Sequence, residues 1–169
     1  MRLVFAESQE SLEVVIGHLL SAHKQTLAIA ESCTGGLITH RLTNVPGSSG
    51  YLVAGVIAYA YEAKVAALGV SWDTLNQSGA VSEAVARAMA RGVREKFSST
   101  LGLAVTGIAG PGGSAFKPEG RVCFALARRG RAAQSETVEF GARGRSAVRA
   151  ASVARALDLL IAACGPDAA

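Results

Sequence analysis

The sequence is poor in aromatic and charged residues. Aromatic residues occupy 5% and charged residues 18% of the 169 positions, whereas hydrophobic residues occupy 50%. So little charge beside so much apolar side chain excludes an intrinsically disordered chain. The core must therefore be built from aliphatic residues. The length is that of one domain, which we expect to span residues 1–169.

Cysteine is also scarce. The three cysteines, Cys33, Cys123 and Cys164, form no Cys-x-x-Cys pair, which argues against a disulfide framework or zinc knuckle and favours a reducing compartment. The first residues, MRLVFAESQE, hold an apolar stretch too short for a signal peptide, and no apolar run approaches the length of a membrane helix. We therefore expect a cytoplasmic protein that does not enter a membrane.

The basic residues are not gathered into a nucleic-acid-binding patch. The net charge is +4, but the densest basic run, ARRGR from residue 127, looks like a turn between two strands. Few aromatic residues accompany the basic ones, so base stacking has little support. We expect no nucleic-acid partner, and the same charge is compatible with binding a small anion.

Helical and strand patterns alternate along the chain. Alternation of this kind predicts a mixed, mostly parallel sheet that helices cover on both faces. The predicted helices are a first helix capped by Ser8 or Ser11 and ending near His23, then 37–42, 62–68 with Gly69 as its stop, one capped by Ser82, and 145–163. The predicted strands are 26–30, 51–60, 101–107 and an antiparallel pair around Gly130.

Two unusual loops follow predicted strands. Ligands of such sheets bind at the carboxyl ends of strands, where this chain carries ESCTGG from Glu31 and TGIAGPGG from Thr106. The second loop is glycine-rich and offers N–H groups that suit a phosphate, although it matches neither the Walker A nor the dinucleotide-binding pattern. A plain surface loop is an equally good interpretation of it.

ESCTGG places a hydroxyl beside a thiol. Cys33 has no histidine within reach, because His40 lies about two helical turns away, so a buried structural thiol is the better interpretation. Ser32 lies where unpaired N–H groups could stabilise an oxyanion. Its position alone favours a plainer role, in which Ser32 or Thr34 caps the following helix.

A base for Ser32 would have to come from elsewhere in the chain. Lys64 is a candidate because its sequence neighbours are apolar apart from Glu62. An amine acts as a base only when neutral, so its pKa must fall towards neutrality through burial. An ordinary surface lysine is the usual alternative. Arg145 and Arg149, on one face of a helix start, suggest either a nearby anion or a solvated helix end.

Four segments in this order resemble one family, the CinA C-terminal domains, or nicotinamide-nucleotide amidohydrolases. The segments are ESCTGG, AGVIAYAYEAKVAALGV, SGAVSEAVARAMARGVREKF and GLAVTGIAGPGGSAFKPEGRV. The resemblance covers nearly the whole chain. It implies a three-layer α/β/α sandwich around a five-stranded mixed sheet, similar to anticodon-binding domains.

The resemblance also implies an activity, the hydrolysis of nicotinamide mononucleotide to nicotinate mononucleotide and ammonia in pyridine-nucleotide salvage. It implies a serine–lysine mechanism with no metal and no cofactor. By motif match, Ser32 would be the nucleophile, Lys64 the base and Tyr59 an accompanying catalytic residue. The residues implied to bind the nucleotide are Thr34, Gly35, Gly36, Thr106, Gly107, Ile108, Ala109, Gly110 and Arg145. We expect N–H groups of residues 34–36 to hold the oxyanion, and we expect a homodimer.

The chain departs from the family pattern at three places. Ala54-Gly55 stands for Gly-Gly, Ala60-Tyr61 for Ser-Asn, and Arg143-Gly144-Arg145 for Gly-Asp-Arg. The second change puts a phenol close to the presumed catalytic lysine, and the third leaves open which of Arg143, Arg145 and Arg149 binds phosphate. A non-catalytic nucleotide-binding or regulatory module remains the alternative function.

Overall fold

A computed structural model describes residues 10–164. The proposed cap Ser8 and most of the N-terminal segment used to argue against a signal peptide lie outside the described residues. The first helix, α1 (Leu12–Ala22), has Ser11 at its N-cap position, although no side-chain hydrogen bond caps it. None of the helices in the described part of the chain is long and apolar enough to cross a membrane.

The five strands form one mixed sheet in the order β2-β1-β3-β4-β5. β2 and β3 both run parallel to β1, whereas β4 is antiparallel to β3 and β5 is antiparallel to β4. The expected mixed five-stranded sheet is therefore confirmed. In spatial order the strands are β2 (Leu52–Ile57), β1 (Leu27–Glu31), β3 (Leu101–Gly107), β4 (Arg121–Arg128) and β5 (Gln134–Glu139).

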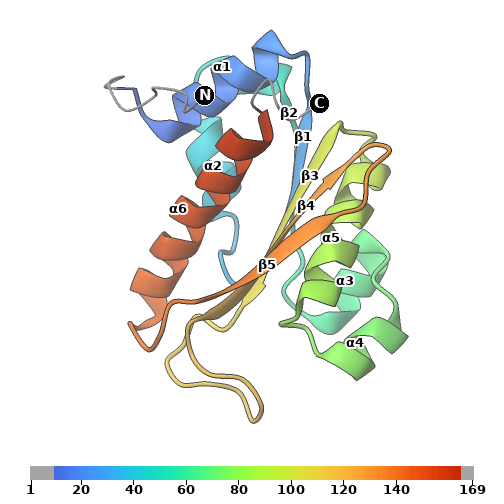
Figure 1. Cartoon of the computed structure of the whole chain (residues 1–169), viewed down its shortest axis with the longest axis vertical. Coiled ribbons are helices and arrows are strands. Elements are labelled where there is room, and N and C mark those ends of the chain that lie inside the picture. Colours follow the sequence, from blue (N-terminus) through green and yellow to red (C-terminus); the bar gives the residue numbers. More distant parts are fainter. Residues whose placement is uncertain (1–9, 165–169) are drawn as a thin grey trace.

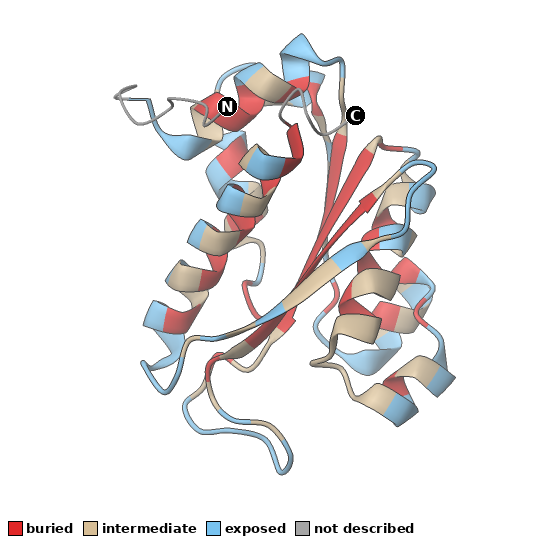
Figure 2. Ribbon diagram, viewed as in Figure 1, coloured by how far each residue is buried: buried red, intermediate tan, exposed pale blue. Residues whose placement is uncertain are grey.

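Helices cover both faces of the sheet, which confirms the three-layer α/β/α arrangement (Figure 1). One layer holds α1, α2 (Leu37–Thr43) and α6 (Arg145–Cys164), and the other holds α3 (Tyr61–Leu68), α4 (Trp72–Ser78) and α5 (Glu83–Lys96). A single 3₁₀ turn, η1 (Ser48–Gly50), leads into β2. Two aliphatic clusters, one on each face of the sheet, form the core, and the central strands are buried along their length (Figure 2).

Local sequence signals explain most of the helix boundaries. Ser82 caps α5 by accepting a hydrogen bond from the Val85 N–H, and Gly69 ends α3 in the left-handed conformation, both as expected. β2 is shorter than the expected 51–60, because residues 58–60 leave the sheet to form the corner before α3. The sequence analysis missed α4, a short helix that buries only Leu75.

The parallel strands bring three loops to one edge of the sheet. Glu31 at the end of β1 lies opposite Ile57 at the end of β2 and Val105 of β3, and β3 ends two residues further on at Gly107. The ESCTGG turn, the corner before α3 and the glycine-rich loop therefore meet at this edge, where ligands of such sheets bind.

Candidate active site

The Lys64 side chain is buried, with 1% of its surface exposed, although it carries the only amine of α3. Its Nζ lies 3.1 Å from Ser32 Oγ and donates hydrogen bonds to the carbonyl oxygens of Ala58, at 2.8 Å, and Tyr59, at 3.0 Å. The alternative interpretation of Lys64 as an ordinary surface lysine is therefore wrong. Burial is the main cause that lowers the pKa of Lys64, and the neighbouring Cys33 opposes this shift.

The corner between β2 and α3 orients the Lys64 amine. Lys64 lies in the first turn of α3, and the two carbonyl acceptors come one and two residues before its N-cap residue, Ala60. The two carbonyls can only accept hydrogen bonds. They fix two hydrogens of the amine, so a neutral Lys64 has its lone pair left for the Ser32 hydroxyl.

Ser32 does not cap a helix. α2 begins at Leu37, and its N-cap residue is Gly36 in the left-handed conformation, which has no side chain to cap it. The Glu31 carboxylate instead accepts from the N–H groups of Ile38 and Thr39 in the first turn. The expectation that Ser32 or Thr34 caps α2 is thus wrong, because the N-cap residue is Gly36, four and two positions further along the chain. The Ser32 N–H bonds to the Val105 carbonyl at 3.0 Å, which ties the serine to the end of β3. Ser32 is 7% exposed, so its hydroxyl is close to the surface but shielded from most solvent.

Cys33 has the environment of a structural thiol. It is buried in the cluster that packs between the sheet and α6. Burial raises its pKa to about 12, so the thiolate is not populated near neutral pH. Structure and sequence agree that Cys33 is a poor nucleophile, and Ser32 remains the candidate.

The N–H groups expected to hold an oxyanion are largely occupied. The Gly35 N–H bonds to the Ser32 carbonyl at 3.1 Å, and the Gly36 N–H bonds to the Glu31 carboxylate at 3.0 Å. Of residues 34–36, only Thr34 keeps an N–H without a hydrogen-bond partner within residues 10–164, and the N–H of Cys33 is equally without one. Of the expected donors, Thr34 is therefore the one that remains available, and Cys33 joins it as a candidate.

Tyr59 and Arg145 meet at the mouth of the site. Arg145 Nη2 donates to Tyr59 Oη at 2.8 Å, and Arg145 Nη1 donates to the Gly110 carbonyl at 3.0 Å. Tyr59 is 59% exposed. The side chain of Tyr59 is thus at the surface, while its backbone carbonyl accepts a hydrogen bond from the Lys64 amine. Arg145 joins the corner before α3 to the glycine-rich loop.

The three candidate arginines differ in their surroundings. Arg149 Nη2 donates to the Thr34 carbonyl at 3.0 Å, and its Nε is buried without a partner in the described part of the chain. The Arg143 side chain is exposed and has no hydrogen-bond partner within residues 10–164. Arg145 and Arg149 therefore line the candidate site, whereas Arg143 does not contact it.

Thr106 anchors the glycine-rich loop from inside the protein. It is 1% exposed, and its Oγ1 donates to the Ala80 carbonyl at 2.9 Å. Beyond it, the Ile108 N–H bonds to the Arg121 carbonyl at 2.9 Å, so Gly107 and Ile108 continue the contact with β4, and Ala109 is buried. Gly110 of this loop accepts a hydrogen bond from another candidate site residue, Arg145.

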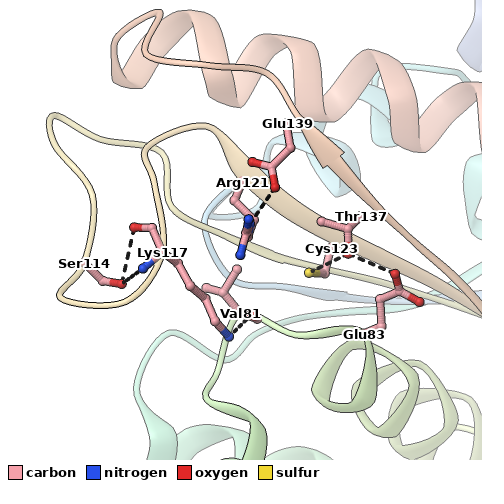
Figure 3. Close-up of polar contacts among 8 residues, drawn as sticks. All are labelled: Val81, Glu83, Ser114, Lys117, Arg121, Cys123, Thr137 and Glu139. Atoms are coloured by element: carbon pink, nitrogen blue, oxygen red, sulfur yellow. Dashed lines mark hydrogen bonds and ion pairs between the residues drawn. The ribbon is translucent and has the colours of Figure 1, made fainter.

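Two further side chains fix the far part of this loop. Lys117 Nζ donates to the carbonyls of Ser78, at 2.8 Å, and Val81, and the turn at Ser114 closes over its backbone (Figure 3). The Glu119 carboxylate accepts from the N–H groups of Gly112, at 2.6 Å, and Gly144, at 2.9 Å. The loop is thereby tied both to the end of α4 and the turn that follows it, and to the segment before α6.

Sequence reasoning missed Glu31 and Glu119 as members of this site. Glu31 is the first letter of the ESCTGG motif, and a carboxylate ahead of a helix start is a signal for N–H binding. Glu119 gave no such signal, because its partners lie in separate loops. Tyr61, which the departure from the family pattern singled out, accepts a long hydrogen bond from the Ala80 N–H at 3.4 Å rather than contacting the amine.

A cavity lies at the opposite end of the sheet, away from the carboxyl ends of β1 and β3. Its volume is about 610 Å³, and its lining residues include Phe124, Arg128 and Leu159. Arg128 pairs with Leu101 at the beginning of β3, which is the end remote from Thr106. The cavity is therefore separate from the Ser32–Lys64 pair.

Comparison with known proteins agrees with this fold. Residues 9–164 match the CinA C-terminal domain, and the chain belongs to that family. The CinA-like proteins of Geotalea daltonii and of Synechococcus sp. strain CC9902 are 54% identical over 125 residues and 48% identical over 161 residues. The matches cover 73% and 94% of this chain but only 30% and 38% of those relatives, so the chain spans about a third of their length.

Solved structures of the family share the whole architecture. The competence/damage inducible protein CihA from Agrobacterium tumefaciens is 41% identical and superposes with a TM-score of 0.86, covering 89% of this chain and 92% of that one. A competence-damaged protein (CinA) superfamily protein from Escherichia coli is 32% identical with a TM-score of 0.86, covering 96% and 94%. The fold expected from the resemblance is thus confirmed.

Proposed function

We propose that this chain is an amidohydrolase that hydrolyses the carboxamide of nicotinamide mononucleotide, with Ser32 as nucleophile and Lys64 as base. The observation that carries the proposal is the buried Lys64 amine at 3.1 Å from Ser32 Oγ. A nucleophile within hydrogen-bond reach of a base whose pKa burial lowers is the arrangement that acyl-transfer catalysis needs. The products would be nicotinate mononucleotide and ammonia, which serves pyridine-nucleotide salvage.

The acylation step uses both side chains. Neutral Lys64 takes the proton of Ser32 Oγ as the oxygen forms a bond to the amide carbon. The carbonyl oxygen becomes an oxyanion, which the N–H groups of Cys33 and Thr34 would stabilise. The C–N bond then breaks, protonated Lys64 gives its proton to the leaving nitrogen, and ammonia departs.

Deacylation reverses these roles. Water attacks the acyl carbon and loses a proton to Lys64, and the bond to Ser32 Oγ breaks as that oxygen regains the proton. No metal or redox partner enters these steps. The substrate's phosphate would lie near Arg145, whose planar guanidinium has further N–H donors beyond the two that bind Tyr59 and Gly110.

Ammonia release from nicotinamide mononucleotide tests the proposal. We expect Ser32→Ala to reduce turnover to background and Lys64→Met to reduce it by at least about a hundredfold, the usual contribution of a general base. Lys96→Met is the matched control, since Lys96 also donates to a backbone carbonyl, that of Ala67, but on an exposed surface. Circular dichroism checks that each variant is folded.

Two results would contradict the proposal in different ways. Near-normal turnover of Ser32→Ala or Lys64→Met would remove that residue from its role. Tight binding of the nucleotide by the unmodified chain without any ammonia would instead identify a non-catalytic nucleotide-binding module.

A further inference from the structure

The Glu31 side chain is fully buried and collects four hydrogen bonds. Its Oε2 accepts from the N–H groups of Gly36, at 3.0 Å, and Ile38, at 3.2 Å. Its Oε1 accepts from the Thr39 N–H at 2.9 Å and from Thr39 Oγ1 at 2.8 Å. No lysine, arginine or histidine within residues 10–164 forms an ion pair with it. The burial of this carboxylate is therefore balanced by helix N–H groups and one hydroxyl.

These contacts close the loop that carries Ser32. Glu31 ends β1, and its partners begin five residues later, so the carboxylate spans the turn rather than capping α2 from the adjacent position. Residues 32–35 are held between a strand end and a helix start that the same side chain joins. The position of Ser32 thus depends on Glu31 although Glu31 does not touch its hydroxyl.

The backbone of Glu31 contacts the other half of the pair. Its carbonyl accepts from the Ala58 N–H at 2.9 Å, and the Ala58 carbonyl in turn accepts from Lys64 Nζ at 2.8 Å. One residue therefore links the segment that holds the nucleophile to the segment that holds the base.

Gly55 leaves room for this arrangement. A Cβ at Gly55 of β2 would lie 2.4 Å from Thr39 Oγ1, the hydroxyl that binds Glu31. A side chain at this position would push Thr39 away from the carboxylate. The neighbouring strand is thus shaped around the Thr39–Glu31 contact.

We propose that Glu31 is a positioning residue that sets the distance between Ser32 and Lys64 and occupies the N–H groups of α2, leaving Cys33 and Thr34 to serve the oxyanion. The effect of Glu31 on catalysis rests on the proposed function of Ser32 and Lys64. Glutamine at this position presents an NH₂ group to two of the four donors, so the turn cannot keep the same closure. A misplacement of about 1 Å is enough to slow a reaction by as much as about a hundredfold.

The test uses a neutral probe that needs no nucleotide pocket. Ser32 Oγ displaces fluoride from phenylmethanesulfonyl fluoride, forming an O–S bond while Lys64 accepts the proton. The pseudo-first-order rate constant for labelling of Ser32, followed by mass spectrometry, does not depend on the fraction of active protein. We expect Glu31→Gln to slow labelling by about tenfold or more and Thr39→Val by a smaller factor, since it removes one of four hydrogen bonds.

Thr43→Val is the matched control. Thr43 is also on α2, but its hydroxyl donates to the carbonyls of Thr39 and His40, away from Glu31. We expect its labelling rate to stay at the level of the unmodified chain. If Glu31→Gln does not fold, Thr39→Val compared with Thr43→Val decides. Equal labelling of the Glu31 or Thr39 variant and the control would reduce Glu31 to a helix cap and overturn the proposal.

Failure of the amidase proposal can be distinguished from failure of the Glu31 proposal. Labelling of Ser32 without ammonia release from nicotinamide mononucleotide would reject the substrate while leaving the Glu31 comparison intact. If the unmodified chain is not labelled, a crystal structure of Glu31→Gln decides instead. A Ser32 Oγ–Lys64 Nζ separation beyond hydrogen-bond distance supports the positioning role, and an unchanged separation overturns it.

Discussion

Lys64 Nζ and Ser32 Oγ lie 3.1 Å apart although 32 residues separate them in the chain. The parallel pairing of β1 with β2 places Glu31 opposite Ile57, so the residues that follow the two strands emerge side by side. The contact is thus a product of sheet register, and the burial of the amine follows from the helices that cover the sheet.

The free energy of unfolding should depend on pH through Lys64. Burial lowers the pKa of Lys64 in the folded state, so the unfolded chain binds more protons between that value and the ordinary lysine pKa of about 10.4. Stability conferred by this group is therefore lost as pH falls through that window and gained as pH rises. We expect Lys64→Met to flatten the slope of stability against pH, measured by urea unfolding. An identical slope in both proteins would contradict the lowered pKa.

The pH dependence of ammonia release should report the same group. Because the base acts only when neutral, kcat/KM should rise with pH through the pKa of Lys64, at a pH below that of an ordinary lysine. Tyr59→Phe is the control, because it removes a phenol at the mouth of the site and keeps the backbone carbonyl that binds the amine. A rising limb that disappears in Tyr59→Phe would assign it to the tyrosine.

Arg145 should carry the recognition of phosphate. We expect Arg145→Ala to raise KM for nicotinamide mononucleotide by about tenfold or more and to affect nicotinamide riboside, which lacks the phosphate, much less. Arg143→Ala is the matched control, because Arg143 is exposed and has no hydrogen-bond partner within residues 10–164. A larger effect of Arg143→Ala than of Arg145→Ala would reverse the assignment.

Cys33 should be chemically inert in the folded protein. Since burial raises its pKa to about 12, iodoacetamide should leave native Cys33 unmodified at neutral pH and react once the chain is unfolded. Cys33→Ala should keep turnover within about fivefold and lower stability by about 1 kcal/mol, the effect of a small cavity. Loss of all turnover in folded Cys33→Ala would make the thiol part of the chemistry.

Local patterns in the sequence predicted most of the fold. Apolar runs marked the central strands, and Ser82 and Gly69 marked helix ends, because those signals act within a few residues. The short helix α4 was not predicted, because it buries a single residue, Leu75, and its sequence therefore shows little hydrophobic periodicity.

The candidate site was only partly predictable. Motif resemblance supplied Ser32 and Lys64, but sequence alone favoured a capping serine and a surface lysine. What overturned both expectations is tertiary: the strand register sets the distance to Ser32, and packing around α3 removes water from the amine. The hydrogen bonds of Glu31 to α2 also required coordinates, and one of them occupies the N–H of Gly36, an expected oxyanion donor.

The enclosure of Lys64 has a consequence for proton exchange. With 1% of its surface exposed, the amine has almost no contact with bulk water. In the proposed mechanism, a proton taken from Ser32 would therefore stay on Lys64 until the departing nitrogen accepts it, and a second proton would pass from water through Lys64 to Ser32 during deacylation. Added buffer bases should accordingly not accelerate the reaction of the intact protein. In Lys64→Ala they should not reach the position left empty by the side chain, whereas a small amine could enter that space.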